Sequence, residues 1–286
     1  MAGLTELARD KLSVGTRHKI ALWRVKARMA FPTKGMLPNV LVIGAQRAGT
    51  SSLYRYLGSH PQVVASIRKE VEYFSTRMSM GERWYRAHFP LVSRPEVTFE
   101  ATPDYMLHPL AAERAAARIP ELRAVALVRD PVTRALSQYG HQRRLGKEPL
   151  QFLDALKAEP DRIRGDLARF DDDPDHPGVA VRIHGYVERG RYAQQLQRWF
   201  DTLGRERVHV IRTEDLWADP HATYGALLDF LGLDEVFPQA FSNYSYTPQV
   251  GGERAGMTPE AEAFLREALA DEISRVSELL GRDLGW

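Results

Sequence analysis

Residues 39–52 constrain the fold of this chain more than any other segment. The apolar run 40–43 predicts a buried strand that breaks at Gly44, and a helix is predicted to begin near Thr50. A glycine turn between a strand and a helix directs free backbone N–H groups and the positive end of the helix dipole at one point. The segment therefore predicts a binding loop for a phosphate-like anion.

The glycine spacing of this loop matches that of the nucleotide-triphosphate P-loop, with four residues between Gly44 and Gly49. That motif has a lysine at the next position, where this chain has Thr50. The only cation inside the turn is Arg47. We expect a loop that holds a phosphate-like group without the lysine that ATPases place on the β- and γ-phosphates.

Composition narrows the class of protein. The 286 residues suggest one or two domains, and the absence of cysteine excludes disulfides and thiolate zinc sites. A net charge of +2 gives no indication of nucleic-acid binding. Because the chain has neither a run of about 18 apolar residues nor the apolar core of a signal peptide, we expect no transmembrane helix and a cytoplasmic location.

Residues 1–36 are predicted to form a basic helical N-terminal extension, with eight Lys and Arg against two acidic residues. One interpretation is an amphipathic helix in peripheral contact with an anionic membrane, at its inner face. The other is a solvated extension that packs on the domain. The second is favoured, because charge runs usually face water.

Residues 37–286 are predicted to form one α/β domain, a P-loop-like three-layer sandwich whose central parallel sheet is flanked by helices. Strands alternating with helices indicate this architecture, in which ligands bind at the carboxyl ends of the strands. Residues 171–178 have the composition of a loop. The predicted strands are 40–43, 97–101, 124–129 and 208–212, and the predicted helices are 51–57, 110–119, 132–144, 150–158, 192–202, 220–231 and 259–280.

A second polar segment follows the strand at 124–129. Asp130 and Pro131 begin a helix there, and Ser137 lies about two turns inside it. An arginine at a strand end, Arg129, beside a helix hydroxyl suits a second phosphate. The alternative is an Arg–Asp pair that only caps the helix.

Both segments together resemble the sulfotransferases that use 3′-phosphoadenosine 5′-phosphosulfate (PAPS). Further segments at 69–74, 84–85, 100–105 and 138–143 follow in the order typical of that family, from residue 38 to the C-terminus. The similarity is greatest to the heparan sulfate N- and O-sulfotransferase-like enzymes of the glycan branch and to their bacterial relatives. It implies in-line sulfuryl transfer from PAPS, without a metal, to a hydroxyl or amine of a carbohydrate or hydroxylated metabolite.

The resemblance implies three catalytic residues. Glu70 matches the family's base, although an exposed loop glutamate is the alternative. Arg47 replaces the loop lysine and can stabilise charge on the oxygen between phosphate and sulfur, but it cannot donate a proton as lysine can. His141, one turn past Ser137, is a candidate to orient the acceptor or act as base, or else a half-buried helix histidine. Glu72 is expected to face solvent or acceptor.

The resemblance also implies the residues that bind the donor. Arg129 and Ser137 would hold the 3′-phosphate, whereas the hydroxyls at the start of the first helix would bind the phosphosulfate, cap the helix, or both. Ala101 stands where some heparan-type members have a lysine. The remaining donor-binding residues are Gly44, Gln46, Arg47, Ala48, Gly49, Thr50, Ser51 and Ser52 in the first loop, and Gly251, Gly252 and Arg254 in a later glycine-containing loop.

Two other functions stay open at this point. A P-loop kinase or NTPase would need magnesium and ATP, and the missing lysine speaks against it. A nucleotide-binding pseudoenzyme or scaffold would bind the donor without transferring it, since folds can outlive their chemistry. The expected partners of the enzyme are a small-molecule or glycan acceptor, and no nucleic acid.

Overall fold

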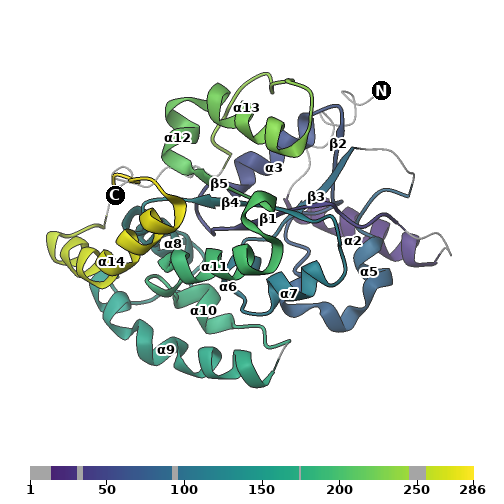
Figure 1. The fold of residues 1–286 in the computed structure, drawn as a ribbon. Helices are drawn as coiled ribbons and strands as arrows, with labels where there is room; N and C mark the ends of the chain where they lie inside the picture. Colours follow the sequence, from purple (N-terminus) through teal and green to yellow (C-terminus); the bar gives the residue numbers. More distant parts are fainter. Residues whose placement is uncertain (1–13, 31–34, 92–95, 174, 245–255) are drawn as a thin grey trace.

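A five-stranded, all-parallel sheet forms the centre of the protein (Figure 1). The computed structural model describes residues 14–30, 35–91, 96–173, 175–244 and 256–286. The order of the strands is β2-β3-β1-β4-β5, so β1 and β4 are neighbours near the middle. The strands are β1 (Val40–Gly44), β2 (Val63–Ala65), β3 (Val97–Ala101), β4 (Arg123–Val128) and β5 (Val208–Arg212).

Helices cover both faces of this sheet, which confirms the predicted three-layer α/β architecture (Figure 1). One face carries α3 (Thr50–Ser59), α12 (Thr213–Ala218) and α13 (Pro220–Leu231). The other carries α6 (Asp104–Leu107), α7 (Ala111–Ala116) and α11 (Tyr192–Leu203). Further out lie α8 (Pro131–Arg144), α9 (Phe152–Asp172), α10 (Val179–His184) and α14 (Pro259–Leu280), and the short α4 (Tyr73–Thr76) and α5 (Glu82–Arg86) follow β2.

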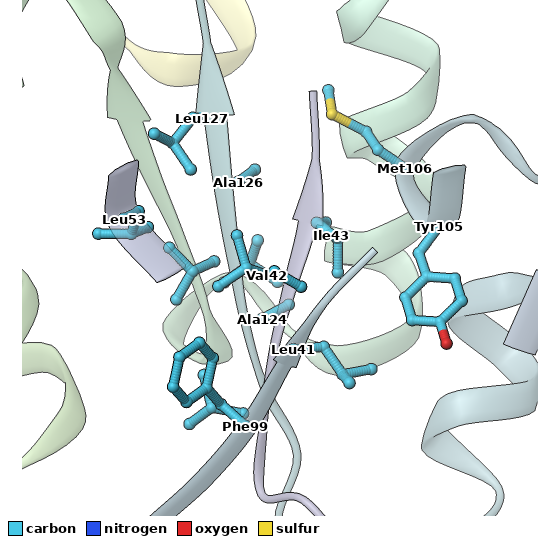
Figure 2. Packing of buried hydrophobic residues seen from close by; sticks show 14 of the residues in the cluster. Leu41, Val42, Ile43, Leu53, Phe99, Tyr105, Met106, Ala124, Ala126 and Leu127 are labelled. Atoms are coloured by element: carbon cyan, nitrogen blue, oxygen red, sulfur yellow. The ribbon is translucent and has the colours of Figure 1, made fainter. Parts of the chain in front are cut away.

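The central strand β1 is buried on both sides, as its uninterrupted apolar run predicts. Leu41 and Ile43 lie on the side that carries Met106 of α6, and Leu53 of α3 lies on the other side (Figure 2). At the end of the strand, a Cβ on Gly44 would lie 2.6 Å from the Cβ of Met106. Glycine is therefore required where α6 approaches the start of the anion-binding loop.

The largest departure from the sequence prediction is α9, which continues to Asp172 instead of ending at residue 158. Pro160 lies inside this helix, at a usual cost of about 3 kcal/mol. Ile163 and Phe170 beyond it are buried, so packing of the second half of α9 offsets the lost backbone hydrogen bond. β2 and the helices α4, α5, α6, α10 and α12, of three to six residues each, were not predicted, because such short segments carry too little hydrophobic periodicity.

Helix α2 (Val14–Ala30) is the described part of the basic N-terminal extension. Ala21 and Val25 are buried, and the Arg28 guanidinium donates to the carbonyl of Ala87 at 3.3 Å, so one side of α2 packs on the domain. Trp23 is 69% exposed. These contacts support an extension packed on the domain, while contact with a membrane stays a prediction. No helix within the described residues has the length and apolarity to span a bilayer.

His88 makes the stability of this fold sensitive to acid. Its side chain is buried beside Trp84, and burial lowers its pKa to about 4 from the ordinary 6.5. The unfolded chain therefore binds the proton first, and the stability contributed by neutral His88 is complete above pH 6.5 and lost as the pH falls towards 4.

We expect the free energy of unfolding of the wild type to lose about 3 kcal/mol more than that of His88→Gln between pH 7 and pH 4. Denaturant unfolding of both proteins across this range measures the difference. Parallel pH profiles would show that His88 is not held neutral in the folded protein.

Candidate active site

The loops that follow β1 and β4 meet at one edge of the sheet. Connections leave the neighbouring strands β1 and β4 in opposite directions, which opens a crevice between their carboxyl ends. The first loop is fixed there: Ala45 N donates to Leu127 O at 2.6 Å, and the Thr213 hydroxyl donates to Ala48 O at 2.7 Å. Gly49, at φ 95°, turns the chain into α3, whose N-terminus no side chain caps. The positive end of α3 thus faces the crevice.

Arg47 links the two loops. Its Nε donates to the Ser137 hydroxyl of α8 at 3.1 Å. Burial, together with the charges of Arg144 and Arg129, lowers the Arg47 pKa to about 10, so the guanidinium is still positive at neutral pH. Among the residues that the structure describes, no carboxylate lies within ion-pair distance of Arg47 or Arg129. Two neighbouring cations without a counter-charge favour the binding of an anion.

Arg129 borders a cavity of about 650 Å³, a volume typical of small-ligand sites. Its Nε donates to the Thr133 hydroxyl at 3.1 Å, and its carbonyl accepts from the Tyr192 hydroxyl at 3.0 Å. Asp130 caps α8 by accepting from Val132 N, rather than pairing with Arg129. The lining comprises Arg129, Asp130, Thr133, Arg212, Thr213, Glu214, Trp217, Asn243, Arg266, Gly285 and Trp286.

Glu70 lies on the opposite side of the α3 N-terminus. Its backbone N–H donates to Ala101 O at the end of β3, at 2.9 Å, and its side chain is 50% exposed. The amine of Lys69 lies between Glu70 and the start of α3. Its Nζ is 3.2 Å from Thr50 Oγ1 and 3.1 Å from Glu70 Oε1. A carboxylate is thus held beside the first hydroxyl of α3.

His141 completes the set of predicted catalytic residues. Burial lowers its pKa, the charges of Arg47 and Arg144 lower it further, and Glu70 opposes them. His141 therefore lies within electrostatic range of both Arg47 and Glu70. It is neutral at physiological pH and has a ring nitrogen able to accept a proton.

Glu72 does not face solvent, so the first of its two expected positions is wrong, while a position facing the acceptor stays a prediction. Its side chain is buried and pairs with Arg77 at 3.0 Å and with Arg182 of α10. Arg182 also pairs with Asp104 of α6 at 2.8 Å. Glu72 therefore anchors the loop that carries Glu70 to two helices, because an unpaired carboxylate would be costly in that position.

The backbone of these loops is strained at three positions. Among the non-glycine residues that the structure describes, left-handed conformations occur at Arg47, Glu70 and Glu72, with φ of 69°, 60° and 63°. Such conformations cost on the order of 1 kcal/mol or more each and concentrate at functional sites. Their position in the two loops that face α3 supports the assignment of the site to this crevice.

Glu100 stabilises the backbone turn that carries Glu70. It is fully buried, and its carboxylate accepts from the hydroxyls of Tyr85 and Tyr105, both at 2.8 Å, and from Thr102 at 2.7 Å. The backbone N–H of Val71 is a fourth donor, at 3.3 Å. This network ties the chain next to Glu70 to the end of β3.

The other predicted donor-binding residues fall into three groups. Gln46 has a buried side-chain oxygen without a partner in the described chain, and Ser51 is half-buried at the crevice end of α3. Ser52 is instead fully buried and accepts from Tyr244 N at 3.0 Å, so its hydroxyl holds the backbone of Tyr244. Gly251, Gly252 and Arg254 lie outside the described residues.

Sequence reasoning gave no role to Lys69, Thr133 or Trp217. Lys69 adjoins Glu70 in the segment 69–74, and this position is the signal that the sequence offers for it. Thr133 lies one helical turn after Arg129, a spacing that brings side chains together. Trp217 had no local signal, because it reaches the cavity from a short helix that was not predicted. No cluster of three or more His, Asp or Glu that could hold a metal occurs within the described residues.

The fold and these loops define an α/β protein with a P-loop-like parallel sheet and a candidate anion site at the carboxyl ends of its strands. The family model of the sulfotransferase domain matches residues 37–251. Human heparan sulfate glucosamine 3-O-sulfotransferase 6 is 32% identical over 275 residues, covering 89% of this chain and 75% of that protein. The chain belongs to the sulfotransferase family and is an enzyme, a sulfotransferase.

Solved structures agree with this assignment. A sulfotransferase from Alicyclobacillus acidocaldarius has a TM-score of 0.72 and 29% identity, over 87% of this chain and 98% of that one. A mouse sulfotransferase complexed with PAP shares the fold, with a TM-score of 0.51 and 14% identity over 92% of this chain and 94% of that one.

Proposed function

We propose that PAPS is the sulfuryl donor and that it lies across the crevice between β1 and β4. The observation that carries this proposal is a pair of neighbouring cations, Arg47 and Arg129, that have no carboxylate partner in the described chain and lie in the loops beside the uncapped N-terminus of α3. PAPS has two separate anionic groups, and the chain offers two separate sets of cations and hydroxyls. The phosphosulfate would occupy the loop at 44–51, and the 3′-phosphate would meet Arg129.

The residues of the crevice fit such a nucleotide. The buried side-chain oxygen of Gln46 has no partner in the described chain, and an amide turned the other way would donate to a phosphate oxygen. Trp217 and Trp286 border the cavity next to Arg129 and offer flat apolar surfaces of the kind that stack on a base. The mouse structure with bound PAP supports the proposal through its shared fold.

The proposed acceptor is a hydroxyl or amine on an amino sugar of a polysaccharide. The human relative named above carries heparan sulfate glucosamine in its name, and it aligns with most of this chain. Glu70, at 50% exposure, is open to an acceptor of this size. A smaller hydroxylated metabolite is the alternative acceptor.

In the proposed reaction, Glu70 accepts the proton of the attacking acceptor group while the new S–O or S–N bond forms. The bond from sulfur to the bridging oxygen breaks, and its electron pair stays on the 5′-phosphate. Arg47 and the N-terminus of α3 stabilise that charge. His141, held neutral, orients the acceptor or shares the work of the base.

Membership in the sulfotransferase family does not support a kinase or NTPase function. A nucleotide-binding pseudoenzyme is distinguished from an active enzyme by experiment. Isothermal titration with 3′-phosphoadenosine 5′-phosphate (PAP), adenosine 5′-phosphate and ATP-magnesium tests the donor. We expect micromolar binding of PAP that depends on its 3′-phosphate.

Labelled PAPS with desulfated heparan-type polysaccharides then tests transfer. Preference for ATP-magnesium would overturn the proposal, and PAP binding without transfer to any acceptor would leave a pseudoenzyme.

A further inference from the structure

We propose that Lys69 is a further catalytic residue, whose amine stabilises the sulfuryl group during transfer. The inference rests on the proposed function, since it takes the phosphosulfate to lie at the start of α3. Its basis is the position of one amine. Nζ of Lys69 is 3.2 Å from Thr50 Oγ1, the first hydroxyl of α3, and 3.1 Å from the Glu70 carboxylate.

The Lys69 amine lies between the proposed position of the phosphosulfate and the proposed base, Glu70. Thr50 begins the helix whose N-terminus faces the crevice, and its side chain is buried. A donor whose phosphosulfate lies at this N-terminus brings its sulfur to the side on which Glu70 lies. An ammonium that bridges Thr50 and Glu70 is therefore next to the sulfuryl oxygens when the acceptor attacks.

Arg47 does not fill the position between Thr50 and Glu70. Its Nε is engaged by the Ser137 hydroxyl, and its neighbouring charges are those of Arg129 and Arg144. The Arg47 guanidinium thus belongs to the side of the loop that adjoins α8. On the opposite side, Lys69 places its ammonium directly against the Glu70 carboxylate and the Thr50 hydroxyl.

The Lys69 side chain is 21% exposed, so it is largely covered by the protein. Charge that develops on oxygen next to a partly buried ammonium is stabilised more strongly than in bulk water. Lys69 keeps its proton in this role. The acceptor proton goes to Glu70, and the electron pair of the broken S–O bond goes to the 5′-phosphate, so the step balances without a further reactant.

A purely structural role predicts different behaviour. If Lys69 only orients Glu70, removing its amine should matter only while the Glu70 carboxylate is present. If Lys69 contacts the sulfuryl group, the loss should persist after Glu70 is replaced. A double-mutant comparison of Lys69→Met with and without Glu70→Gln separates the two roles.

We expect Lys69→Met to lower the transfer rate by roughly 10- to 100-fold and to retain at least a several-fold effect on the Glu70→Gln background. Lys69→Arg should recover much of the rate, because it keeps the charge and the donors. In calorimetry on the slow Glu70→Gln background, Lys69→Met should weaken binding of PAPS but not of PAP, which lacks the sulfuryl group. Lys157→Met, at an exposed position on α9, is the matched control.

An unchanged rate in Lys69→Met would overturn the proposal. So would the loss of its effect on the Glu70→Gln background, or an equal weakening of PAPS and PAP. Thermal unfolding of each variant identifies losses of transfer rate that are caused by misfolding. If Lys69→Met misfolds, the transfer rate of Lys69→Arg is compared with that of the wild type instead. Failure of the proposed function is seen separately, as a wild type that neither binds PAP nor transfers sulfate.

Discussion

Replacing Glu70 by glutamine should lower the rate of sulfuryl transfer by roughly 100- to 10,000-fold, the usual range for loss of a general base. The structure separates this side chain from the scaffold that holds it. The turn is fixed by the backbone N–H of Glu70 on Ala101 O and by Glu72, which pairs with Arg77 and Arg182. The half-exposed carboxylate of Glu70 takes no part in fixing the turn and can act as the base.

Glutamine keeps the shape of that side chain and its tolerance of the turn, but it cannot accept the proton. We therefore expect PAP affinity within about threefold of wild type and an unchanged melting temperature. Single-turnover assays with labelled PAPS, alongside calorimetry with PAP, measure the two quantities. A variant that retains the wild-type rate would remove Glu70 as base and leave His141 as the candidate.

Glu82→Gln is the matched control. Glu82 is 46% exposed and pairs with Arg86, so it resembles Glu70 in exposure and in having a cationic partner. It lies on α5, which packs against α2. A comparable loss of rate in both variants would indicate a general effect of removing surface charge.

The sequence was sufficient to predict the centre of the fold. The segments predicted as strands, 40–43, 97–101, 124–129 and 208–212, all form strands of one parallel sheet, with end points that shift by at most one residue. Buried strands and long helices have strong hydrophobic patterns, and glycine and proline mark their ends. The second half of α9 was missed, because the stabilising packing beyond Pro160 is a tertiary effect.

For the site, the sequence predicted which residues gather but not how they pair. His141 lies within electrostatic range of both Arg47 and Glu70. Their partners come from distant segments: Ser137 accepts from Arg47, and Arg182 holds Glu72 from 110 residues away. Single-sequence patterns carry no record of such pairs, so neither the burial of Glu72 nor the contact of Lys69 with Thr50 could be predicted.

Replacing Arg129 by alanine should weaken PAP binding by roughly 100-fold and leave adenosine 5′-phosphate binding within about threefold. Three arginines border the cavity beside β4, and they differ in their partners. Arg212 pairs with Glu214 and Asp215, and Arg266 with Asp130 and Glu262. Arg129 has only the Thr133 hydroxyl among the described residues.

This contrast makes Arg212→Ala the matched control, because it removes an arginine from the same cavity whose charge is already neutralised. It should lower stability more than it lowers the preference for the 3′-phosphate. Calorimetric titration of both variants with PAP and with adenosine 5′-phosphate measures that preference. An equal loss for the two nucleotides in Arg129→Ala would place the 3′-phosphate elsewhere. A selective loss of PAP would tie the anion preference of the crevice to the one cavity arginine without a carboxylate partner in the described chain.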